Sequence, residues 1–382
     1  MQSRKFTARN HCINDKEGHT LSEPEEALRR WHEYGSSLFS FPESAEPKTK
    51  YSYEVQSDEI EPLPLMTEVE AAAMQLNSGK SPGLDTIPAE LIKNSGEAGI
   101  KAIHYFCCEI WKQQKWPDDW KLQEFVMLHK GGNAKECGNY RTIALISHAS
   151  KILLIIILNR LKGKVEQELP DCQAGYRANR GTTDMLFVLQ IITEKVRECN
   201  EETFITFIDY SKAFDSVIHS KLLVMTKMGF PRHLISLIAS LYQGQKATIR
   251  WSNENCAPFN IAKGVRQGCV LSPHLFSIYT EQIMRDADNE DMGLSIGGRN
   301  ITNLRYADDT ALLSDNLTSM KRIIHRVDTA GKEAGLLLNA KKDQGHARQR
   351  KSITNHTTRG EDRQCKPGKC GTFQIPRVNK SG

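Results

Sequence analysis

Residues 304–313 read LRYADDTALL, an apolar run that is interrupted by Tyr306-Ala307-Asp308-Asp309. Two short apolar runs on either side of a polar turn are typical of a β-hairpin. Adjacent carboxylates repel each other, which raises their pKa values unless a cation lies between them. The stretch therefore predicts a hairpin with an acidic turn. By itself, however, an Asp-Asp pair in a hairpin is more often ordinary turn chemistry than a functional site.

A third acid stands at the end of another expected strand. Residues 204–209 read FITFID, which is rich in aromatic and β-branched residues and ends in Asp209. Burying a carboxylate without a partner is costly, and Mg²⁺ prefers oxygen ligands of this kind. Two such ions roughly 4 Å apart could hold both ends of a phosphoryl displacement. Sequence spacing does not bring residue 209 to residue 308, so their convergence is a hypothesis.

The surrounding sequence predicts helices that alternate with strands, and therefore an α+β fold. Thr67 and Glu70 suggest a capping box for a helix that ends near residue 77. Apolar periodicity predicts further helices at 97–115, 148–168, 181–198, 234–241, 272–287 and 320–330. Further strands are expected at 124–128, 247–251, 259–262 and 336–338.

The distribution of charge and proline divides the 382 residues into three parts. Residues 1–65 carry 12 acids and 8 bases and only one short apolar stripe, which predicts a polar linker, partly disordered, with one short helix. Residues 66–343 carry the folded domain. Residues 344–382 carry 9 bases and 2 acids without apolar periodicity, which predicts a disordered basic tail.

Cysteine usage and hydropathy indicate an intracellular protein. The ten cysteines have no repeating spacing, and the start of the chain has no apolar signal core. These features predict free thiols in a reducing compartment, with nucleus and cytoplasm equally compatible. The longest apolar run, Ile152–Leu158, is too short to cross a bilayer and predicts a buried helix.

Seven stretches, in this order, resemble the motifs of reverse transcriptases of LINE-type (non-LTR) retrotransposons, closest in style to the jockey-like and related animal branches. They cover about residues 66–343: Lys80–Glu90, Asn139–Ile143, Gln173–Arg177, Phe207–Asp215, Gly264–Pro273, Arg305–Asp309 and Gly335–Lys342. One such motif would be weak evidence, whereas seven in order are specific.

The resemblance implies a right-hand polymerase fold with fingers and a palm, in which helices pack on an antiparallel palm sheet. It implies an RNA-directed DNA polymerase that extends the 3′-hydroxyl of a DNA primer with deoxynucleoside triphosphates on an RNA template. Two Mg²⁺ ions, or Mn²⁺ in their place, would be bridged by Asp209 and Asp308. The backbone carbonyl of Tyr210 would be a further ligand, and Asp309 would support the site more loosely.

The resemblance also implies roles for residues that contact the nucleotide. Phe214 would lie under the sugar and exclude a 2′-hydroxyl. Lys130 and Arg141 would reach the triphosphate, arginine as a fork and lysine as a point charge. Asp215 is expected to be a structural acid that is bonded to local backbone. Without the motifs, Phe214 would be interpreted as a core residue, and Lys130 and Arg141 as solvated surface.

The resemblance implies further positions near the base pair and the leaving group. Gln267 and Gly268 would sit beside the incoming base pair, where glycine lets the backbone approach closely. Lys342 would donate a proton to pyrophosphate, with Lys341 as a competing assignment.

Several departures from the family pattern favour a second reading. His129 stands where the family usually has proline, and Gly131 stands where it usually has lysine. Residues 344–382 lack the periodicity of a helical thumb, so we expect the thumb to be missing or truncated. The alternative is a catalytically inactive retrotransposon fragment that keeps the fold and binds nucleic acid non-specifically. A viral RNA-dependent RNA polymerase is a third reading, against which Phe214 argues.

Overall fold

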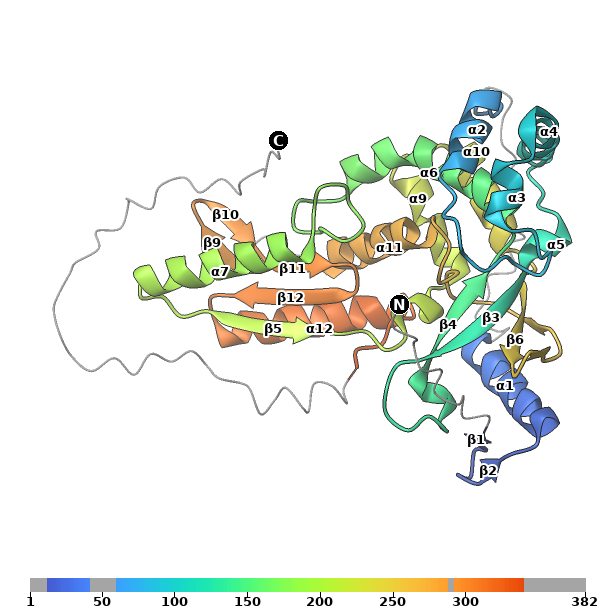
Figure 1. The fold of residues 1–382 in the computed structure, drawn as a ribbon. Coiled ribbons are helices and arrows are strands. Elements are labelled where there is room, and N and C mark those ends of the chain that lie inside the picture. The colour runs from blue at the N-terminus through green and yellow to red at the C-terminus, as the bar shows by residue number, and fades with distance from the viewer. Residues whose placement is uncertain (1–11, 42–59, 288–291, 340–382) are drawn as a thin grey trace, which may run out of the picture. The chain divides into compact units, whose positions relative to one another are not determined.

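The computed structural model describes residues 12–41, 60–287 and 292–339 (Figure 1). The chain forms two compact units, each built from two stretches of sequence. The first unit takes its described residues from Met1–Val165 and Phe214–Leu275, and the second from Glu166–Ala213 and Phe276–Gly382. Helices and strands are mixed in both, which confirms the predicted α+β class.

The second unit is built on a three-stranded antiparallel sheet with the order β11-β12-β5. Its strands are β5 (Phe204–Ile208), β11 (Asn303–Tyr306) and β12 (Asp309–Ser314). Strands β11 and β12 form the predicted hairpin, and β5 is the predicted apolar strand. Leu312 and Leu313 are fully buried, so both faces of the central strand are covered.

Helices pack on this sheet because each has one apolar face. On α7 (Thr182–Glu198), Val188 and Ile192 are buried against Leu304 and Leu313 of the sheet. Helix α12 (Leu317–Glu333) begins at Asn316, whose side chain accepts a hydrogen bond from the Ser319 N–H at 2.8 Å. The remaining elements of this unit are the part of α11 (Ser272–Ala287) from Phe276 onward and the hairpin of β9 (Leu294–Ile296) and β10 (Arg299–Ile301).

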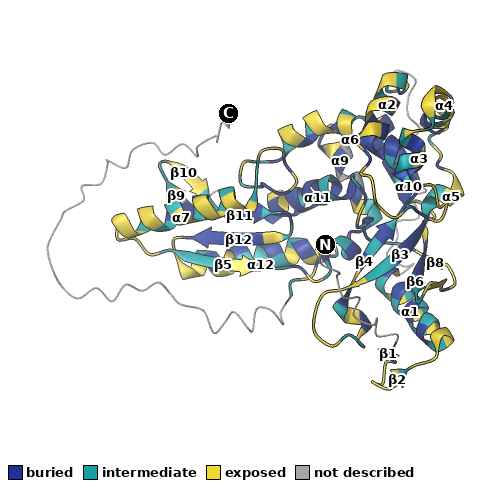
Figure 2. Cartoon of the chain, in the orientation of Figure 1, coloured by how far each residue is buried: buried dark blue, intermediate teal, exposed yellow. Residues whose placement is uncertain are grey.

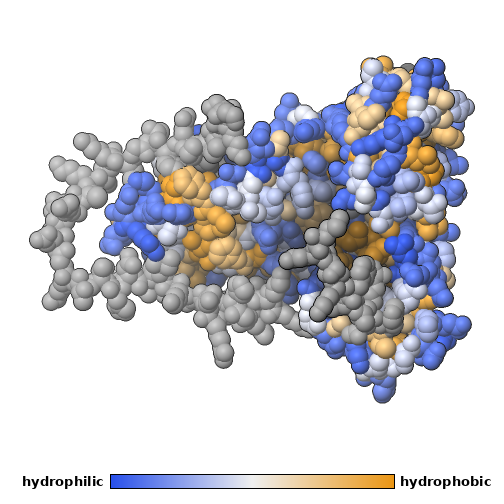
Figure 3. All heavy atoms as spheres, viewed as in Figure 1, coloured by the Kyte–Doolittle hydropathy of each residue, from blue (hydrophilic) through white to orange (hydrophobic). Residues whose placement is uncertain are grey.

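Not all apolar residues of the second unit are buried (Figure 2). Apolar surface gathers over α7 and the strands beside it (Figure 3). Leu186 and Phe187 of α7 are exposed, as is Phe207 of β5. These three side chains therefore do not belong to the core of this unit.

The first unit contains a second sheet, in which β3 is parallel to β6 and the other pairs are antiparallel. The strand order is β4-β3-β6-β7, and β8 also pairs with β6. The strands are β3 (Leu122–His129), β4 (Tyr140–Leu145), β6 (Lys246–Trp251), β7 (Glu254–Asn255) and β8 (Phe259–Asn260).

Helix α6 (His148–Glu168) carries the long apolar run, and Ile152 to Ile157 are all buried, which confirms a buried helix. No helix in the described ranges is long and apolar enough to cross a bilayer. The other helices and short turns are α2 (Met66–Met74), α3 (Ala89–Lys93), α4 (Gly96–Gln113), α5 (Asp118–Lys121), η3 (Cys137–Asn139), α8 (Ala213–Ser216), η4 (His219–Leu223), α9 (Val224–Lys227) and α10 (Arg232–Tyr242).

Residues 12–41 differ from the predicted polar linker, because they form part of the first unit. After the short pair β1 (Ile13–Asn14) and β2 (Thr20–Leu21), helix α1 (Pro24–Phe39) buries Trp31 and Phe39. The Trp31 ring lies 5.3 Å from that of Tyr140 and 5.1 Å from that of Trp251. The described part of the expected linker is thus a packed helix that covers the sheet.

Smaller differences concern caps and short strands. The N-terminus of α2 is capped by Glu68, which accepts the Leu65 N–H at 2.8 Å, and not by the pair Thr67 and Glu70. Strands β1, β2, β4, β7, β9 and β10 were not predicted. The strand expected at 336–338 is reduced to a single bridge between Leu338 and Tyr210. The predicted tail at 344–382 lies outside the described residues.

Candidate active site

The hairpin turn and the end of β5 lie at the same end of the second unit's sheet. Tyr306 pairs with Asp309, which leaves Ala307 and Asp308 as the turn. On the other side of β12, Thr310 pairs with Ile208. Asp309, which precedes Thr310, and Asp209, which follows Ile208, therefore lie at the same edge. Antiparallel register thus brings Asp209 to the end of the sheet that carries Asp308 and Asp309, although Asp209 and Asp309 are 100 residues apart in sequence.

The three carboxylates differ in exposure. Asp309 is exposed, whereas Asp209 and Asp308 are partly buried. Among the residues that the structure describes, no group of three or more His, Cys, Asp or Glu side chains is arranged to hold a metal ion. A Mg²⁺ site needs only one or two protein carboxylates, because water and substrate phosphates complete its octahedral shell. The donor chemistry of Asp209 and Asp308 fits such an ion.

Asp209 is held by the segment that follows α12. The side-chain amide of Asn339 donates to Asp209 Oδ2 at 3.3 Å, and the Asn339 backbone N–H donates to the Asp209 carbonyl at 2.9 Å. The Ser211 N–H donates to the Leu337 carbonyl at 2.8 Å. Tyr210 is buried, and burial raises the pKa of its hydroxyl to about 12. Asn339 is a site residue that the motif contained but to which sequence reasoning assigned no role.

The hairpin is held on its other side by residues 172–175. The Arg305 N–H donates to the Cys172 carbonyl at 2.7 Å, and the Ala174 N–H donates to the Arg305 carbonyl at 2.9 Å. A Cβ on Gly175 would lie 2.3 Å from the Ala307 nitrogen, so glycine lets the two backbones touch. Residues 173–177, one of the seven motif stretches, thus lie in the second unit against the hairpin.

Arg305, in β11 two residues before the turn, is fixed by a buried ion pair. Its Nη2 lies 2.6 Å from Glu281 Oε2, and the two side chains are 2% and 6% exposed. Glu281 also accepts from Arg285 Nε at 2.9 Å. Burial alone lowers the pKa of Arg305, but the neighbouring Cys172 and Glu281 outweigh it and raise that pKa above its ordinary value. The guanidinium therefore stays charged, and its strand is tied to α11.

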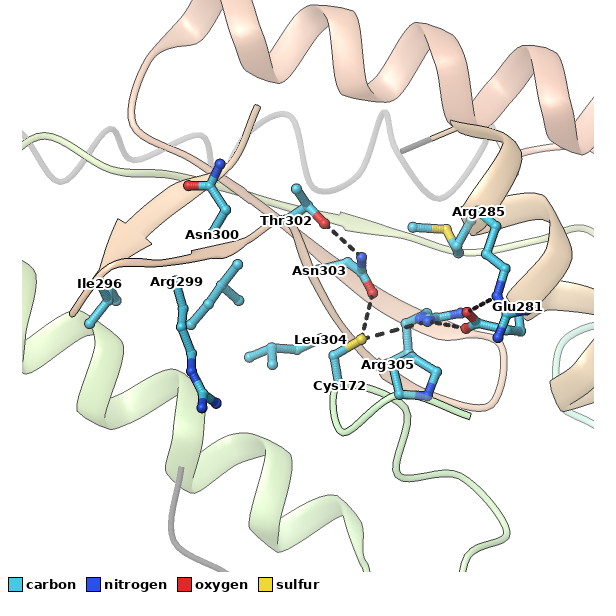
Figure 4. Close-up of a pocket in the computed structure, with 13 residues that line it drawn as sticks. Cys172, Glu281, Arg285, Ile296, Arg299, Asn300, Thr302, Asn303, Leu304 and Arg305 are labelled. Atoms are coloured by element: carbon cyan, nitrogen blue, oxygen red, sulfur yellow. Dashed lines mark hydrogen bonds and ion pairs between the residues drawn. The ribbon is translucent and has the colours of Figure 1, made fainter. Parts of the chain in front are cut away.

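These residues line a pocket of about 270 Å³ in the second unit (Figure 4). Cys172, Glu281 and Arg305 form one wall, and the β9–β10 hairpin forms another. Dashed lines in Figure 4 join Cys172 to Asn303 and Arg305, and further lines join Glu281 to Arg305 and Arg285. This pocket therefore lies on the side of β11 that is held by the 172–175 segment.

The predicted phosphate-binding cations lie in the first unit. Arg141 is exposed on β4 opposite Leu128, and Lys130 is exposed directly after β3. The backbone N–H of Lys130 donates to the Asn139 carbonyl at 2.9 Å. Gly131 has a φ of 130°, a conformation that a lysine would adopt only with strain. The departure from the family pattern at this position thus has a backbone reason.

In the first unit, hydrogen bonds link the segment that carries Phe214 to the segment that carries Gln267. The Val265 N–H donates to the Phe214 carbonyl at 2.8 Å. Gln267 Nε2 donates to Asp215 Oδ1 at 2.6 Å, and Thr142 donates to the same oxygen at 3.3 Å. Asp215 is buried, as expected of a structural acid, and these two partners are side chains that are distant from it in sequence.

Gly268 is exposed and has a φ of 107°. A Cβ there would lie 3.1 Å from the Ala144 carbonyl, and the Ala144 N–H donates to the Gln267 carbonyl at 2.7 Å. Glycine is therefore required by both conformation and space. The predicted nucleotide contacts Lys130, Arg141, Phe214, Gln267 and Gly268 all belong to the first unit, and Lys342 lies outside the described residues.

Comparison with known proteins shows to which family the chain belongs. A model of the family "Reverse transcriptase (RNA-dependent DNA polymerase)" matches residues 128–357. The chain is 31% identical over 254 residues to a probable RNA-directed DNA polymerase from transposon BS of Drosophila melanogaster. The matched region covers 64% of this chain and 27% of that protein. The chain is 28% identical over 263 residues to the RNA-directed DNA polymerase from mobile element jockey of the same species, which covers 66% and 28% respectively.

A third relative is the retrovirus-related Pol polyprotein from the type-1 retrotransposable element R2 of Popillia japonica, to which the chain is 28% identical over 229 residues, or 59% of this chain and 32% of that protein. The chain thus spans about a third or less of the length of these relatives. The family match covers more than half of the chain and includes the acidic hairpin, β5 and the Gly264–Pro273 stretch. The chain belongs to the reverse transcriptase (RNA-dependent DNA polymerase) family.

Proposed function

We propose that this chain is an RNA-directed DNA polymerase that extends a primer 3′-hydroxyl with deoxynucleoside triphosphates on an RNA template. The observation that carries this proposal is the register that brings Asp209 and the Asp308-Asp309 turn to one end of a single sheet. A reverse transcriptase domain implies a nucleic-acid template, a primer and nucleotides as its substrates.

The second unit corresponds to the palm and the first unit to the fingers. An antiparallel sheet that carries the three acids and is packed by helices supports the first assignment. The second is supported by the presence of Lys130, Arg141 and Gln267 in the other unit.

Asp209 and Asp308 would hold the divalent ions that this family generally uses, with the Tyr210 carbonyl as a further ligand and Asp309 as support. When bound there, such ions would supply the charge that lowers the pKa of the attacking hydroxyl and offsets that of the leaving pyrophosphate. The protein mainly positions these groups. Asn339 orients the Asp209 carboxylate, and residues 172–175 hold the turn that bears Asp308.

The predicted nucleotide contacts select and bind the incoming nucleotide. Phe214 excludes a 2′-hydroxyl by its volume, and Arg141 and Lys130 bind the triphosphate. Gln267 and Gly268 lie beside the base pair, and Lys342 donates a proton to the leaving group. The backbone bond between Phe214 and Val265 supports a fixed position for the aromatic ring.

The decisive variant is Asp308→Asn/Asp309→Asn. Each amide keeps the shape of the side chain but removes the negative charge that a divalent ion needs. We expect dTTP incorporation on poly(A)–oligo(dT) in the presence of Mg²⁺ to fall by at least about 10²–10³-fold. The matched control is Asp118→Asn/Asp119→Asn, another adjacent pair, which is exposed at the start of α5 and should leave incorporation unchanged.

Equal incorporation by the hairpin variant and the control would contradict the site assignment. Chelation of Mg²⁺ should abolish the activity of the unaltered chain. If the unaltered chain binds RNA in a salt-sensitive manner but never extends a primer, the inactive alternative holds instead.

A further inference from the structure

The turn that bears Asp308 has a backbone that does not hold itself in place. Ala307 is buried, and its φ is 60°, in the left-handed region that residues other than glycine, asparagine and aspartate seldom adopt. Conformations of this kind persist only when surrounding contacts determine them. Some contact must therefore fix the peptide between Tyr306 and Ala307.

That contact comes from the side chain of Gln173, which is fully buried. Its Oε1 accepts a hydrogen bond from the Ala307 N–H at 3.1 Å and another from the Gly175 N–H at 2.8 Å. Two donors converge on this atom, so it must be the oxygen and the amide cannot be turned round. One atom thus joins the hairpin turn to the segment against which it packs.

The other end of the same amide is not satisfied. Gln173 Nε2 is buried and has no hydrogen-bond partner in the described part of the chain. A buried donor without an acceptor is destabilising, so stability alone does not explain a glutamine here. An apolar side chain of the same shape would avoid that cost but would leave the Ala307 and Gly175 donors without an acceptor. The oxygen is therefore the part of the residue that the site needs.

We propose that Gln173 is a positioning residue, whose amide oxygen fixes the turn that presents the Asp308 carboxylate. For catalysis this inference rests on the proposed function. For the geometry of the turn it does not, because the two hydrogen bonds exist whether or not the chain polymerises DNA.

The experiment compares Gln173→Met, which keeps the length of the side chain but has no oxygen, with Gln173→Glu, which keeps an oxygen at that position. The matched control is Gln190→Met, because Gln190 is exposed on α7 and bonds only to Glu194, at 2.9 Å, among the hydrogen bonds of the described residues. Amide hydrogen exchange measured by NMR reads the turn directly, without any activity.

In Gln173→Met, we expect the protection of the Ala307 and Gly175 amides against hydrogen exchange to fall at least tenfold. The protection of the Leu312 amide, in the middle of β12, should stay unchanged. Gln173→Glu should retain the protection at both amides. In primer extension, kcat of Gln173→Met should fall ten- to hundredfold while KM for dTTP stays within twofold, since a displaced catalytic group slows the chemical step more than it weakens binding.

Unchanged protection at Ala307 in the methionine variant would overturn the proposal. So would a loss that spreads equally to Leu312, because Gln173 would then act only on the stability of the fold. An unaltered chain that fails to extend primers contradicts the proposed function, while the exchange measurement still decides the role of Gln173. Full kcat with lost protection would show that the turn can move without effect, which also overturns the proposal.

Discussion

Gly175 and Ala307 meet backbone to backbone, and this contact sets how closely the hairpin can sit on its support. The added Cβ of any other residue at 175 would lie 2.3 Å from the Ala307 nitrogen and 2.9 Å from its Cα. Both of those atoms belong to backbone, which cannot rotate aside as a side chain can. A single methyl group at this point therefore has to move the turn that carries Asp308.

We expect Gly175→Ala to reduce primer extension by about 10²-fold, because a displacement near 1 Å of a catalytic group has an effect of this size. The free energy of unfolding should fall by about 1–3 kcal/mol through overpacking. Primer-extension kinetics and urea unfolding measure the two effects. Gly163→Ala is the control, since its Cβ would meet nothing within 4 Å. Full activity of Gly175→Ala would show that the close contact is not needed.

His219 is expected to make the stability of the first unit depend on pH. Its Nε2 donates to the Gly264 carbonyl at 2.7 Å, and burial lowers the pKa of the ring to about 4. The unfolded chain, with a pKa near 6.5, therefore binds the proton more readily than the folded one. The contribution of His219 to stability is full above pH of about 6.5 and is lost as the pH falls towards 4.

The loss attributable to His219 between pH 7 and pH 4 should reach at most about 3 kcal/mol, and less where solvent reaches the ring. The variant His219→Gln should flatten the corresponding part of the curve of unfolding free energy against pH. The same substitution at His325, which is exposed on α12, should leave the curve unchanged. Parallel curves for His219→Gln and the unaltered chain would contradict the assignment. Urea unfolding at intervals of half a pH unit measures these curves for the unaltered chain and for both variants.

Among the elements, α1 departs furthest from its sequence-based prediction. The apolar stripe at Trp31, Tyr34, Leu38 and Phe39 suggested one short helix in a linker. The buried face instead consists of Ala27, Trp31, Gly35 and Phe39. Alanine and glycine carry almost no hydrophobic signal, but Gly35 is essential to the packing, because a Cβ there would lie 2.5 Å from the Phe259 ring.

We expect Trp31→Ala to lower the free energy of unfolding by about 3–5 kcal/mol, because it deletes a fully buried ring that contacts Tyr140 and Trp251. Denaturant unfolding measures this loss, with Ser37→Ala on the exposed side of α1 as the control. If residues 12–41 were only a linker, both variants would unfold at the same denaturant concentration.

Across the whole chain, the sequence was sufficient for elements with a strong local pattern and insufficient for contacts between distant residues. Strand β5, the acidic hairpin and α6 followed from their apolar runs and turn chemistry. The roles of Gln173 and Asn339 did not, because each depends on a side-chain hydrogen bond to a partner 134 or 130 residues away. Such a contact leaves no periodicity. The convergence of Asp209 with the hairpin likewise depends on strand register, which no single segment encodes.

The bond between Asn339 and Asp209 also bears on how the protein is made. Synthesis runs from the N-terminus, so Asp209 leaves the ribosome long before Asn339 does. A nascent chain that has passed residue 314 already contains both strands of the hairpin and β5, yet the partner that orients the Asp209 carboxylate has not been translated. We therefore expect the end of this sheet that carries Asp209 and the acidic hairpin to be the last part of the second unit to reach its native arrangement.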